Sequence, residues 1–501
     1  MKLTECEKTW QEGVIKPQEA ARYLEGGRDF IDDRLIEEQL KQAHPDPARI
    51  REIIAKALSV ETLLPAEAAC LLNLKDEGLW QEVFDAAAKI KNRVYDNRVV
   101  TFAPLYVSSL CVNNCAYCGF RSENDRMKRR RLSLKEIEEE TRILCGDIGH
   151  KRLILVCGEH PSSGADYICD AMKTIYGVKV RARSGEGQIR RVNVNAAPMD
   201  IADFRKVKEA GIGTYQVFQE TYHHATYARL HPYGTLKSDF KWRLYSLHRA
   251  MEAGIDDVAI GALFGLYDWK FEVMGMLCHA RDLEKRFGLG PHTVSVPRLE
   301  PASNAEFTVE RSPHRVSDED FRKVIAVLRL SIPYAGLIVT CRETPSMIRS
   351  VLPMCTQRDA STRLGIGAYA ESKNGQEEAR QQFILGDDRS LDEVIRELAS
   401  MDYITSFCTA GYRCGRTGKN IMTLLKTGKE GCFCKLNAIL TFQEWLCDFA
   451  SPQTQEIGAA IIQKELEEVR SRVPRDFTPH LLEQTLEYWE RIKRGDRDLS
   501  F

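Results

Sequence analysis

The spacing of apolar positions divides the chain into three stretches. Up to about residue 98, apolar and charged residues recur at helical spacing, most clearly over Ile31–Leu58 and Ala66–Tyr95. From Val99 onward, short apolar and β-branched runs alternate with amphipathic segments of helical period. From about residue 385 the pattern is helical and irregular again. We therefore predict a helical N-terminal segment over residues 1–98, a strand–helix region over 99–384 and a C-terminal extension over 385–501.

The middle stretch predicts a parallel sheet. Its strand-like runs are Val99–Val107, Arg152–Cys157, Val178–Arg181, Arg191–Ala196, Thr214–Gln219, Asp257–Ala262, His292–Leu299 and Leu337–Cys341. The helical segments between them include Leu134–Leu144, Ile201–Ala210, Phe240–Ala253, Phe271–Phe287 and Asp318–Leu328. Ser133 and Glu136 form a capping box in front of the first helical segment. Repeated strand–helix units favour a parallel sheet, and their number suits an α/β fold, a (β/α)8 TIM-type barrel that is complete or slightly open.

Composition excludes some classes of partner. With 71 Lys and Arg against 72 Asp and Glu, the formal charge of -1 gives no reason to expect nucleic acid or an anionic membrane as partner. No run of 18 apolar residues is present, so we expect no membrane-spanning helix. The first ten residues lack the apolar core of a secretory signal, which predicts a cytoplasmic protein. In that compartment the 16 cysteines are expected to be thiols or metal ligands rather than disulfides.

Three closely spaced cysteines carry the strongest chemical signal. Cys111, Cys115 and Cys118 have C-x3-C-x2-C spacing, with Tyr117 just before the last. Four cysteines complete a 4Fe–4S cluster, so three leave one iron open. An open iron is what S-adenosylmethionine needs to chelate through its amino and carboxylate groups. A zinc knuckle is the alternative, but such a site usually closes with a fourth Cys or His at short spacing, and none follows before His150. The pattern resembles that of the radical S-adenosylmethionine enzymes.

Several residues at predicted strand ends are candidates for binding ligands. In a barrel of this class the chemistry lies at the carboxyl ends of the strands. The residues at those ends include Gly158, Glu159, Asn193, Asn195, Gln219, Glu220, Gly261, Arg298 and Arg342. Each alone is a weak signal, because glycine often ends strands and charged residues there often form rim salt bridges. Their joint occurrence with the cysteine motif favours a shared site for a ligand that carries both an ammonium and a carboxylate.

Longer segments resemble one family, the HydG radical tyrosine lyases that mature FeFe-hydrogenase. The segments that carry the resemblance are residues 111–121, 158–161, 192–199, 211–223, 264–268, 291–298 and 497–501. The resemblance runs from about residue 66 to the end of the chain. The 2-iminoacetate synthases of thiamine biosynthesis (ThiH) share the barrel but lack the long C-terminal extension. The length of this chain therefore favours the HydG family.

The resemblance implies a reaction and roles for named residues. The reaction is reductive cleavage of S-adenosylmethionine to a 5′-deoxyadenosyl radical, which takes a hydrogen from the amine of L-tyrosine. The Cα–Cβ bond then breaks to give p-cresol and dehydroglycine. The implied cofactor contacts are Gly158, Glu159, Asn195, Tyr117 and Gly261, and the implied catalytic residues are Glu220, Arg298 and Arg342. Arg298 and Arg342 are candidates for holding the two carboxylates. The implied partners are flavodoxin or ferredoxin as electron donor and a hydrogenase-maturation scaffold protein.

The tail departs from the family pattern. HydG proteins carry C-x2-C-x22-C there, for a second cluster that converts dehydroglycine into carbon monoxide and cyanide. In this chain Cys408 and Cys434 match the first and third positions, but Gly411 occupies the second. Two further cysteines, Cys414 and Cys432, lie nearby, so the second cluster is either lost or held by one of them. His279 matches a family histidine at the extra iron of that site, and it is equally compatible with a core position.

Two other functions stay open. One alternative is a radical enzyme of the same barrel that acts on a different amino acid, since Gln357–Arg363 departs from the family phrase near the substrate. The other alternative is a non-catalytic iron–sulfur carrier. The cysteine triad together with Gly158 and Glu159 argues against the carrier, because a carrier has no need to bind S-adenosylmethionine. We expect tyrosine cleavage to be intact and carbon monoxide formation to be impaired.

Overall fold

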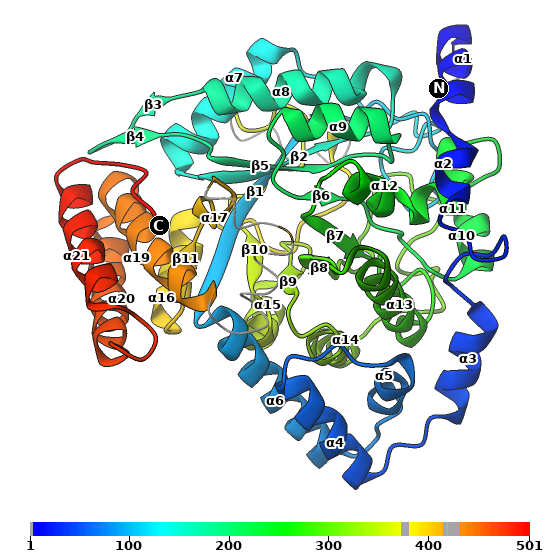
Figure 1. Ribbon diagram of the computed structural model, residues 1–501. Coiled ribbons are helices and arrows are strands. Elements are labelled where there is room, and N and C mark those ends of the chain that lie inside the picture. The colour runs from blue at the N-terminus through cyan, green and yellow to red at the C-terminus, as the bar shows by residue number, and fades with distance from the viewer. Residues whose placement is uncertain (1–3, 372–379, 414–417, 419–429) are drawn as a thin grey trace.

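A parallel barrel forms the centre of the molecule (Figure 1). The structure is a computed structural model and describes residues 4–371, 380–413, 418 and 430–501. Within these residues the barrel strands follow the order β10-β9-β8-β7-β6-β5-β2-β1, and β1 also pairs with β10, which closes the ring. They are β1 (Arg98–Ser108), β2 (Arg152–Cys157), β5 (Arg191–Asn195), β6 (Tyr215–Gln216), β7 (Val258–Gly261), β8 (Thr293–Ser295), β9 (Gly336–Val339) and β10 (Gln357–Asp359). The predicted fold class is confirmed.

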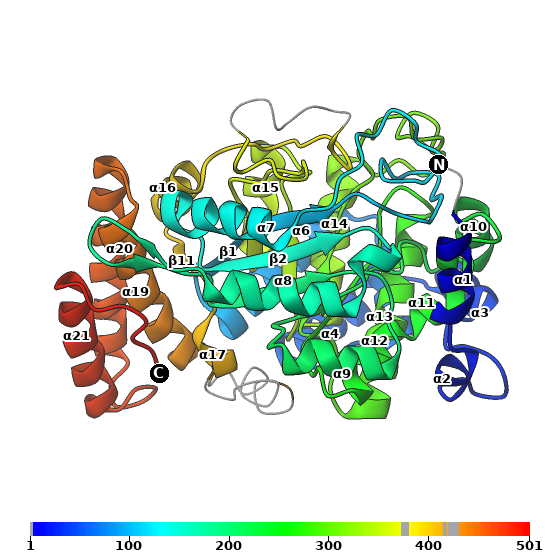
Figure 2. The same cartoon turned by 90° about the horizontal axis from the view of Figure 1, so that it is seen from above.

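Helices surround the barrel and return the chain to the same end of it (Figures 1 and 2). They are α7 (Leu134–Arg142), α8 (Ala165–Gly177), α9 (Ile201–Glu209), α10 (His224–Leu230), α11 (Phe240–Leu244), α12 (Ser246–Glu252), α13 (Trp269–Phe287), α14 (Asp318–Ser331) and α15 (Pro345–Val351). Because every neighbouring pair of barrel strands is parallel, all the carboxyl ends meet at one mouth.

Two strands differ from the prediction. The run Val178–Arg181 supplies only β3 (Val180–Arg181), which pairs antiparallel with β4 (Glu186–Gly187) outside the barrel. The barrel closes instead through β10, whose residues Gln357, Arg358 and Asp359 are polar yet buried. Arg358 is neutralised there by Asp387 at 2.9 Å. Apolar patterning does not detect such a strand, because its polar side chains find partners that are distant in the sequence.

The N-terminal segment is helical. Its elements are α1 (Glu5–Val14), α2 (Pro17–Ala21), α3 (Asp33–Gln42), α4 (Pro47–Leu58), α5 (Pro65–Leu72) and α6 (Glu77–Tyr95). Asp32, Asp46 and Asp76 cap three of these helices by accepting hydrogen bonds from backbone N–H groups of the first turn. Helices α4, α5 and α6 pack against α14, whereas α2 packs against α11 and α12. None of the helices in the described residues is long and apolar enough to cross a membrane.

The C-terminal extension packs on the side of the barrel opposite to α1–α3, as both views show (Figures 1 and 2). It contains β11 (Ile404–Ser406), which pairs with the first three residues of β1. Its helices are α16 (Leu391–Ser400), α17 (Ala410–Arg413), α19 (Glu430–Asp448), α20 (Pro452–Ser471) and α21 (Pro479–Lys493). These helices have their own apolar core, which includes Val99 of β1.

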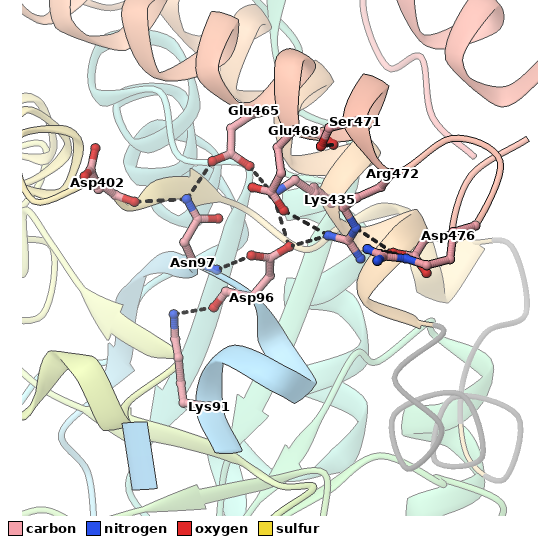
Figure 3. Close-up of polar contacts among 11 residues, drawn as sticks. Lys91, Asp96, Asn97, Asp402, Lys435, Glu465, Glu468, Ser471, Arg472 and Asp476 are labelled. Atoms are coloured by element: carbon pink, nitrogen blue, oxygen red, sulfur yellow. Dashed lines mark hydrogen bonds and ion pairs between the residues drawn. The ribbon is translucent and has the colours of Figure 1, made fainter. Parts of the chain in front are cut away.

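A buried ionic cluster fixes the extension at the start of β1 (Figure 3). Lys435 of α19 is fully buried and contacts Asp96 at 3.1 Å, Glu465 at 2.6 Å and Glu468 at 2.8 Å. Asn97 donates a hydrogen bond to Glu465 at 2.6 Å. Since Asp96 and Asn97 directly precede β1, the cluster joins α19 and α20 to the amino end of that strand.

Candidate active site

A cavity of about 230 Å³ occupies the carboxyl ends of the barrel strands. Cysteine side chains from the loop after β1 line one wall, and residues after β2, β5, β8 and β9 line the others. The polar and charged residues of the lining are Cys111, Asn113, Cys115, Tyr117, Cys118, Cys157, Glu159, Asn195, Gln216, Glu220, Lys237, Arg243, Ser295, Glu300, Thr340, Arg342, Asp359, Thr362 and Gln382. Charged groups of both signs therefore line one cavity.

The loop that carries Cys111, Cys115 and Cys118 is held in place by backbone hydrogen bonds. The Val112 N–H donates to the Glu159 carbonyl at 2.9 Å, and the Ala116 N–H donates to the Leu230 carbonyl at 3.0 Å. All three cysteines line the cavity. Burial raises the pKa of Cys111 to about 11 and that of Cys115 to about 12, so both are thiols unless a metal compensates the thiolate charge.

The three sulfur atoms do not form a site for a single metal ion. In the part of the chain that the structure describes, no three His, Cys, Asp or Glu side chains gather closely enough for that. A four-iron cluster binds each thiolate at a different iron, so its ligands stand further apart. Side-chain amides approach two of the sulfurs: Asn113 Nδ2 lies 3.8 Å from Cys111 Sγ, and Gln382 Nε2 lies 3.6 Å from Cys118 Sγ.

Gly158 lets the loop after β2 pack against the cysteine loop. A Cβ atom on Gly158 would lie 2.3 Å from the Leu110 carbonyl oxygen and 3.1 Å from Cys111 Cβ. The next residue, Glu159, accepts a hydrogen bond from Asn113 Nδ2 at 2.5 Å. Burial raises the pKa of the Glu159 carboxyl, and its hydrogen bond with Asn113 opposes that shift. The structure thus brings Gly158, Glu159 and the cysteine loop together.

The residues predicted to contact the nucleoside part of a cofactor have different positions. Tyr117 and Asn195 line the cavity, and the Tyr117 hydroxyl lies 2.8 Å from His231 Nε2. Gly261 is not part of the lining. A Cβ on Gly261 would lie 2.6 Å from the ring of Phe218, which does line the cavity, so this glycine makes room for Phe218.

Glu220 belongs to an ion-pair cluster within the cavity. Its carboxylate lies 2.7 Å from Lys237 Nζ and 3.1 Å from Arg243 Nη2. Burial alone would raise the pKa of Glu220, but the two cations hold it below its usual value. Sequence reasoning missed Lys237, Arg243 and Asn113 as cavity residues. Lys237 lies after α10 and Arg243 lies on α11, so neither is near a predicted strand end. The sequence holds a signal for Asn113 alone, because this residue lies inside the cysteine motif.

Of the two candidate arginines, only Arg342 lines the cavity. Its guanidinium carbon lies 3.3 Å from the centroid of the Phe383 ring, and Nη1 donates to the Arg298 carbonyl at 3.4 Å. The Arg298 side chain is engaged elsewhere: it bonds both carboxylate oxygens of the buried Glu343 and lies 2.8 Å from Asp318. Arg342 is therefore the one positioned to meet a ligand.

Cys408 of the tail lies at the other end of the barrel. Cys408 follows β11 in a left-handed conformation with φ of 49°. Arg191, the first residue of β5, donates to the Cys408 carbonyl at 3.0 Å and to its sulfur at 3.5 Å. Cys408 therefore lies at the amino ends of the strands, whereas the cysteine loop lies at their carboxyl ends. Cys432 and Cys434 are half-buried near the start of α19, and Cys414 lies outside the described residues.

The structure places His279 in a buried aromatic group. Its Nδ1 lies 2.9 Å from the Tyr222 hydroxyl, and its ring packs against His248 and Phe30. Burial lowers the pKa of His279 to about 3, so the imidazole is neutral. No described contact joins it to a tail cysteine. This position agrees with a core histidine.

Comparisons with known proteins agree with this geometry. The family model for the radical SAM superfamily matches residues 105–274, and that for the biotin and thiamin synthesis associated domain matches residues 295–404. The 2-iminoacetate synthase of Escherichia coli K12 is 30% identical over 351 residues, which are 69% of this chain and 87% of that protein. The FeFe-hydrogenase maturase subunit HydE of Thermotoga maritima is 32% identical over 197 residues, which are 39% of this chain and 51% of that protein.

Two solved structures of FeFe-hydrogenase maturases are similar over nearly the whole chain. A crystal structure of HydG has 45% sequence identity and a TM-score of 0.88, and the match covers 95% of this chain and 100% of that one. The HydG structure from Carboxydothermus hydrogenoformans has 36% identity and a TM-score of 0.74, with 90% and 98% covered. Both likenesses reach into the C-terminal extension, because the share of this chain that they leave uncovered is smaller than that extension.

Proposed function

Because this chain belongs to the HydG family of radical SAM enzymes, we propose that it cleaves the Cα–Cβ bond of L-tyrosine, giving p-cresol and dehydroglycine. Its cofactors are a 4Fe–4S cluster and S-adenosylmethionine. The observation that carries the proposal is that the cysteine loop and Arg342 line one cavity inside a closed barrel. A radical formed beside the cysteine loop can reach an amino acid held by Arg342 without leaving the protein.

The residues present fit both cofactors. Cys111, Cys115 and Cys118 offer three sulfurs at the cavity wall, two of them approached by amide groups. Gln216 also lines the cavity, and its side-chain nitrogen is buried without a hydrogen-bond partner. A buried amide without a partner is costly, so a polar ligand that accepts this hydrogen bond would be favoured.

The chain supplies binding, orientation and exclusion of water. Glu159 would accept a hydrogen bond from the amino group at the methionine end of the cofactor. Arg342 would hold the substrate carboxylate. When bound, the two cofactors supply a 5′-deoxyadenosyl radical. The surrounding barrel keeps other hydrogen donors away from this radical. The amine of tyrosine loses one hydrogen atom, the Cα–Cβ bond breaks, and the aromatic fragment takes up one electron and one proton to become p-cresol.

The test is anaerobic turnover with dithionite, S-adenosylmethionine and L-tyrosine. We expect 5′-deoxyadenosine and p-cresol in similar amounts, and neither product from a variant with Cys111, Cys115 and Cys118 replaced by Ala. We propose flavodoxin or ferredoxin as the physiological electron donor, so replacing dithionite with either reduced protein should sustain turnover. Formation of 5′-deoxyadenosine without p-cresol would contradict tyrosine as substrate.

A different amino acid is the second candidate substrate, and one feature favours it. Asp359 and Thr362, from the segment that departs from the family phrase, line the cavity. Asp359 accepts hydrogen bonds from the Cys341 N–H at 2.8 Å and from Thr362 at 2.7 Å. The test replaces tyrosine with each of the common amino acids in turn and measures the 5′-deoxyadenosine formed. A rise with one of them would identify such a substrate.

We further propose that the tail converts dehydroglycine into carbon monoxide and cyanide only weakly. Such a step needs a cluster that three thiolates hold, so that one iron stays open. In α17, Gly411 stands where the second thiolate is expected, and glycine has no side chain to coordinate iron. Cys408 and Cys434 would have to hold the cluster together with a third ligand, Cys414 or Cys432.

A further inference from the structure

Four carboxylate side chains line the cavity, and three of them have hydrogen-bond donors. Glu159 accepts from Asn113, Asp359 accepts from the Cys341 N–H and from Thr362, and Glu220 accepts from Lys237 and Arg243. Glu300 is the fourth, and its carboxylate receives no hydrogen bond from the described residues. A carboxylate of this kind in the lining of a cavity is available to a ligand.

The backbone on both sides of Glu300 is fixed. The Leu299 N–H donates to the Phe264 carbonyl at 2.8 Å, and the Pro301 carbonyl accepts from the Ile384 N–H at 3.0 Å. Glu300 is therefore held between two anchored neighbours after the end of β8, and it lines the cavity. A fixed backbone is what a residue needs to meet a substrate in one geometry.

Glu300 and Arg342 form a pair of opposite charge at the cavity. Arg342, which lines the cavity, and Arg298, which does not, both attract the carboxylate, while Glu343 repels it. Glu343 is already engaged by Arg298, so the free pair that faces the cavity is Glu300 with Arg342. An amino acid presents an ammonium next to a carboxylate, which matches this pair.

We propose that Glu300 takes a proton from the α-ammonium of the amino-acid substrate while Arg342 holds its carboxylate. The proposal rests on the proposed function. One N–H bond of the ammonium breaks and one O–H bond forms on Glu300, so the electron pair stays on nitrogen and nothing is oxidised. The step has a physical purpose: removal of a hydrogen atom from an ammonium leaves a charged radical, which a poorly solvated cavity disfavours. The neutral amine avoids that cost.

The acidity of Glu300 suits the step. Burial first and the nearby Glu343 second raise the pKa of the Glu300 carboxyl to about 7, against the opposing effects of Arg342 and Arg298. A base works best when its pKa lies near the working pH. Since the base form is the carboxylate, the rate of tyrosine cleavage is expected to rise as pH increases through about 7.

The experiment compares Glu300→Gln and Glu300→Asp with the wild-type holoenzyme over neutral and alkaline pH. Near neutral pH we expect kcat/KM for p-cresol to fall about 100-fold in Glu300→Gln, the scale of general base catalysis, and to recover partly in Glu300→Asp. At alkaline pH the substrate deprotonates by itself, so the deficit of Glu300→Gln should shrink. The amount of 5′-deoxyadenosine formed without substrate should be unchanged, which shows that both cofactors are in place.

A matched control is Asp318→Asn. Asp318 contacts Arg298 at 2.8 Å but is 73% exposed and outside the cavity, so its pH profile should equal that of the wild type. A Glu300→Gln enzyme that keeps the wild-type rate, or loses the same factor at every pH, would overturn the proposal for Glu300 alone. A wild-type enzyme that makes no p-cresol would instead overturn the proposed function, and this proposal with it.

Discussion

Gly158 has no side chain, and this allows the loop after β2 to pack against the cysteine loop. The position of a Cβ on Gly158 is 2.3 Å from a backbone oxygen, Leu110 O, which cannot swing away as a side chain can. We predict that Gly158→Ala lowers reductive cleavage of S-adenosylmethionine at least about 10-fold, because close packing tolerates no such overlap. The readout is 5′-deoxyadenosine formed with dithionite.

The control for this prediction lies on the same loop. In Gly164→Ala the new Cβ would have its nearest neighbour, Pro161 O, at 3.7 Å, which is ordinary contact. This variant should cleave the cofactor at the wild-type rate. Equal activity of the Gly158 and Gly164 variants would show that the close approach has no consequence.

Substitution of the two candidate arginines should have different effects on stability and on substrate binding. Arg298 pairs with Glu343, which is 2% exposed, so Arg298→Ala leaves a buried charge without its partner and should destabilise the fold by about 3 kcal/mol. Arg342→Ala removes a group of the cavity and should raise the KM for tyrosine with little change in stability. Thermal unfolding and steady-state kinetics on both variants separate the two effects. A raised KM and normal stability in Arg298→Ala would reverse the assignment.

At the scale of elements, the attachment of α19 depends on one buried lysine (Figure 3). Lys435 compensates Glu465, which is 1% exposed, so Lys435→Met should cost about 3 kcal/mol of local stability. We expect amide hydrogen exchange in α19 and α20 to accelerate about 100-fold, because these helices open more often when the charge is unpaired. Mass spectrometry of peptides from α19 and α20 measures it.

Lys464→Met is the matched control, since Lys464 pairs with Asp402 at the surface and its side chain is 59% exposed. Exposed pairs contribute little to stability, so exchange should stay near the wild-type rate. If the Lys435 variant exchanges no faster than this control, the ionic cluster is not what holds the extension.

At the scale of the whole molecule, the barrel separates the cysteine loop from Cys408 of the tail. The loop with Cys111 lies at the carboxyl ends of the strands, and Cys408 lies beside Arg191 at their amino ends. We predict that the native chain forms p-cresol at a normal rate but gives less than an equal amount of carbon monoxide, and that Gly411→Cys restores the missing part. Ligand bonds at a metal must fall within a few tenths of an ångström, so a displaced thiolate is a poor substitute. Haemoglobin trapping of carbon monoxide, set against p-cresol, measures the ratio.

Cys408→Ser tests the separation itself. With its thiolate removed, carbon monoxide should disappear while p-cresol formation stays within about 2-fold, because a distant substitution has little effect on an independent site. Carbon monoxide equal to p-cresol in the native chain would show that Cys414 or Cys432 replaces the missing ligand, and the prediction of an impaired tail would be wrong.

The sequence by itself determined the barrel and the place of its cysteine loop. Both are encoded locally: apolar periodicity reports strands and helices, and thiolate spacing within one loop reports the cluster. The same local reasoning misplaced Val178–Arg181 and overlooked β10, because a polar strand such as Gln357–Asp359 shows no apolar pattern.

Only the tertiary structure decided which charged residue faces the cavity. Arg298 and Arg342 have equal standing as strand-end cations in the sequence, yet Glu343 and Asp318 engage the first while the second stays in the lining. Glu300 stands out for the same reason, since no segment among the described residues supplies its carboxylate with a hydrogen-bond donor. Partners of side chains come from segments far apart in the sequence, and the distances between those segments exist only after folding.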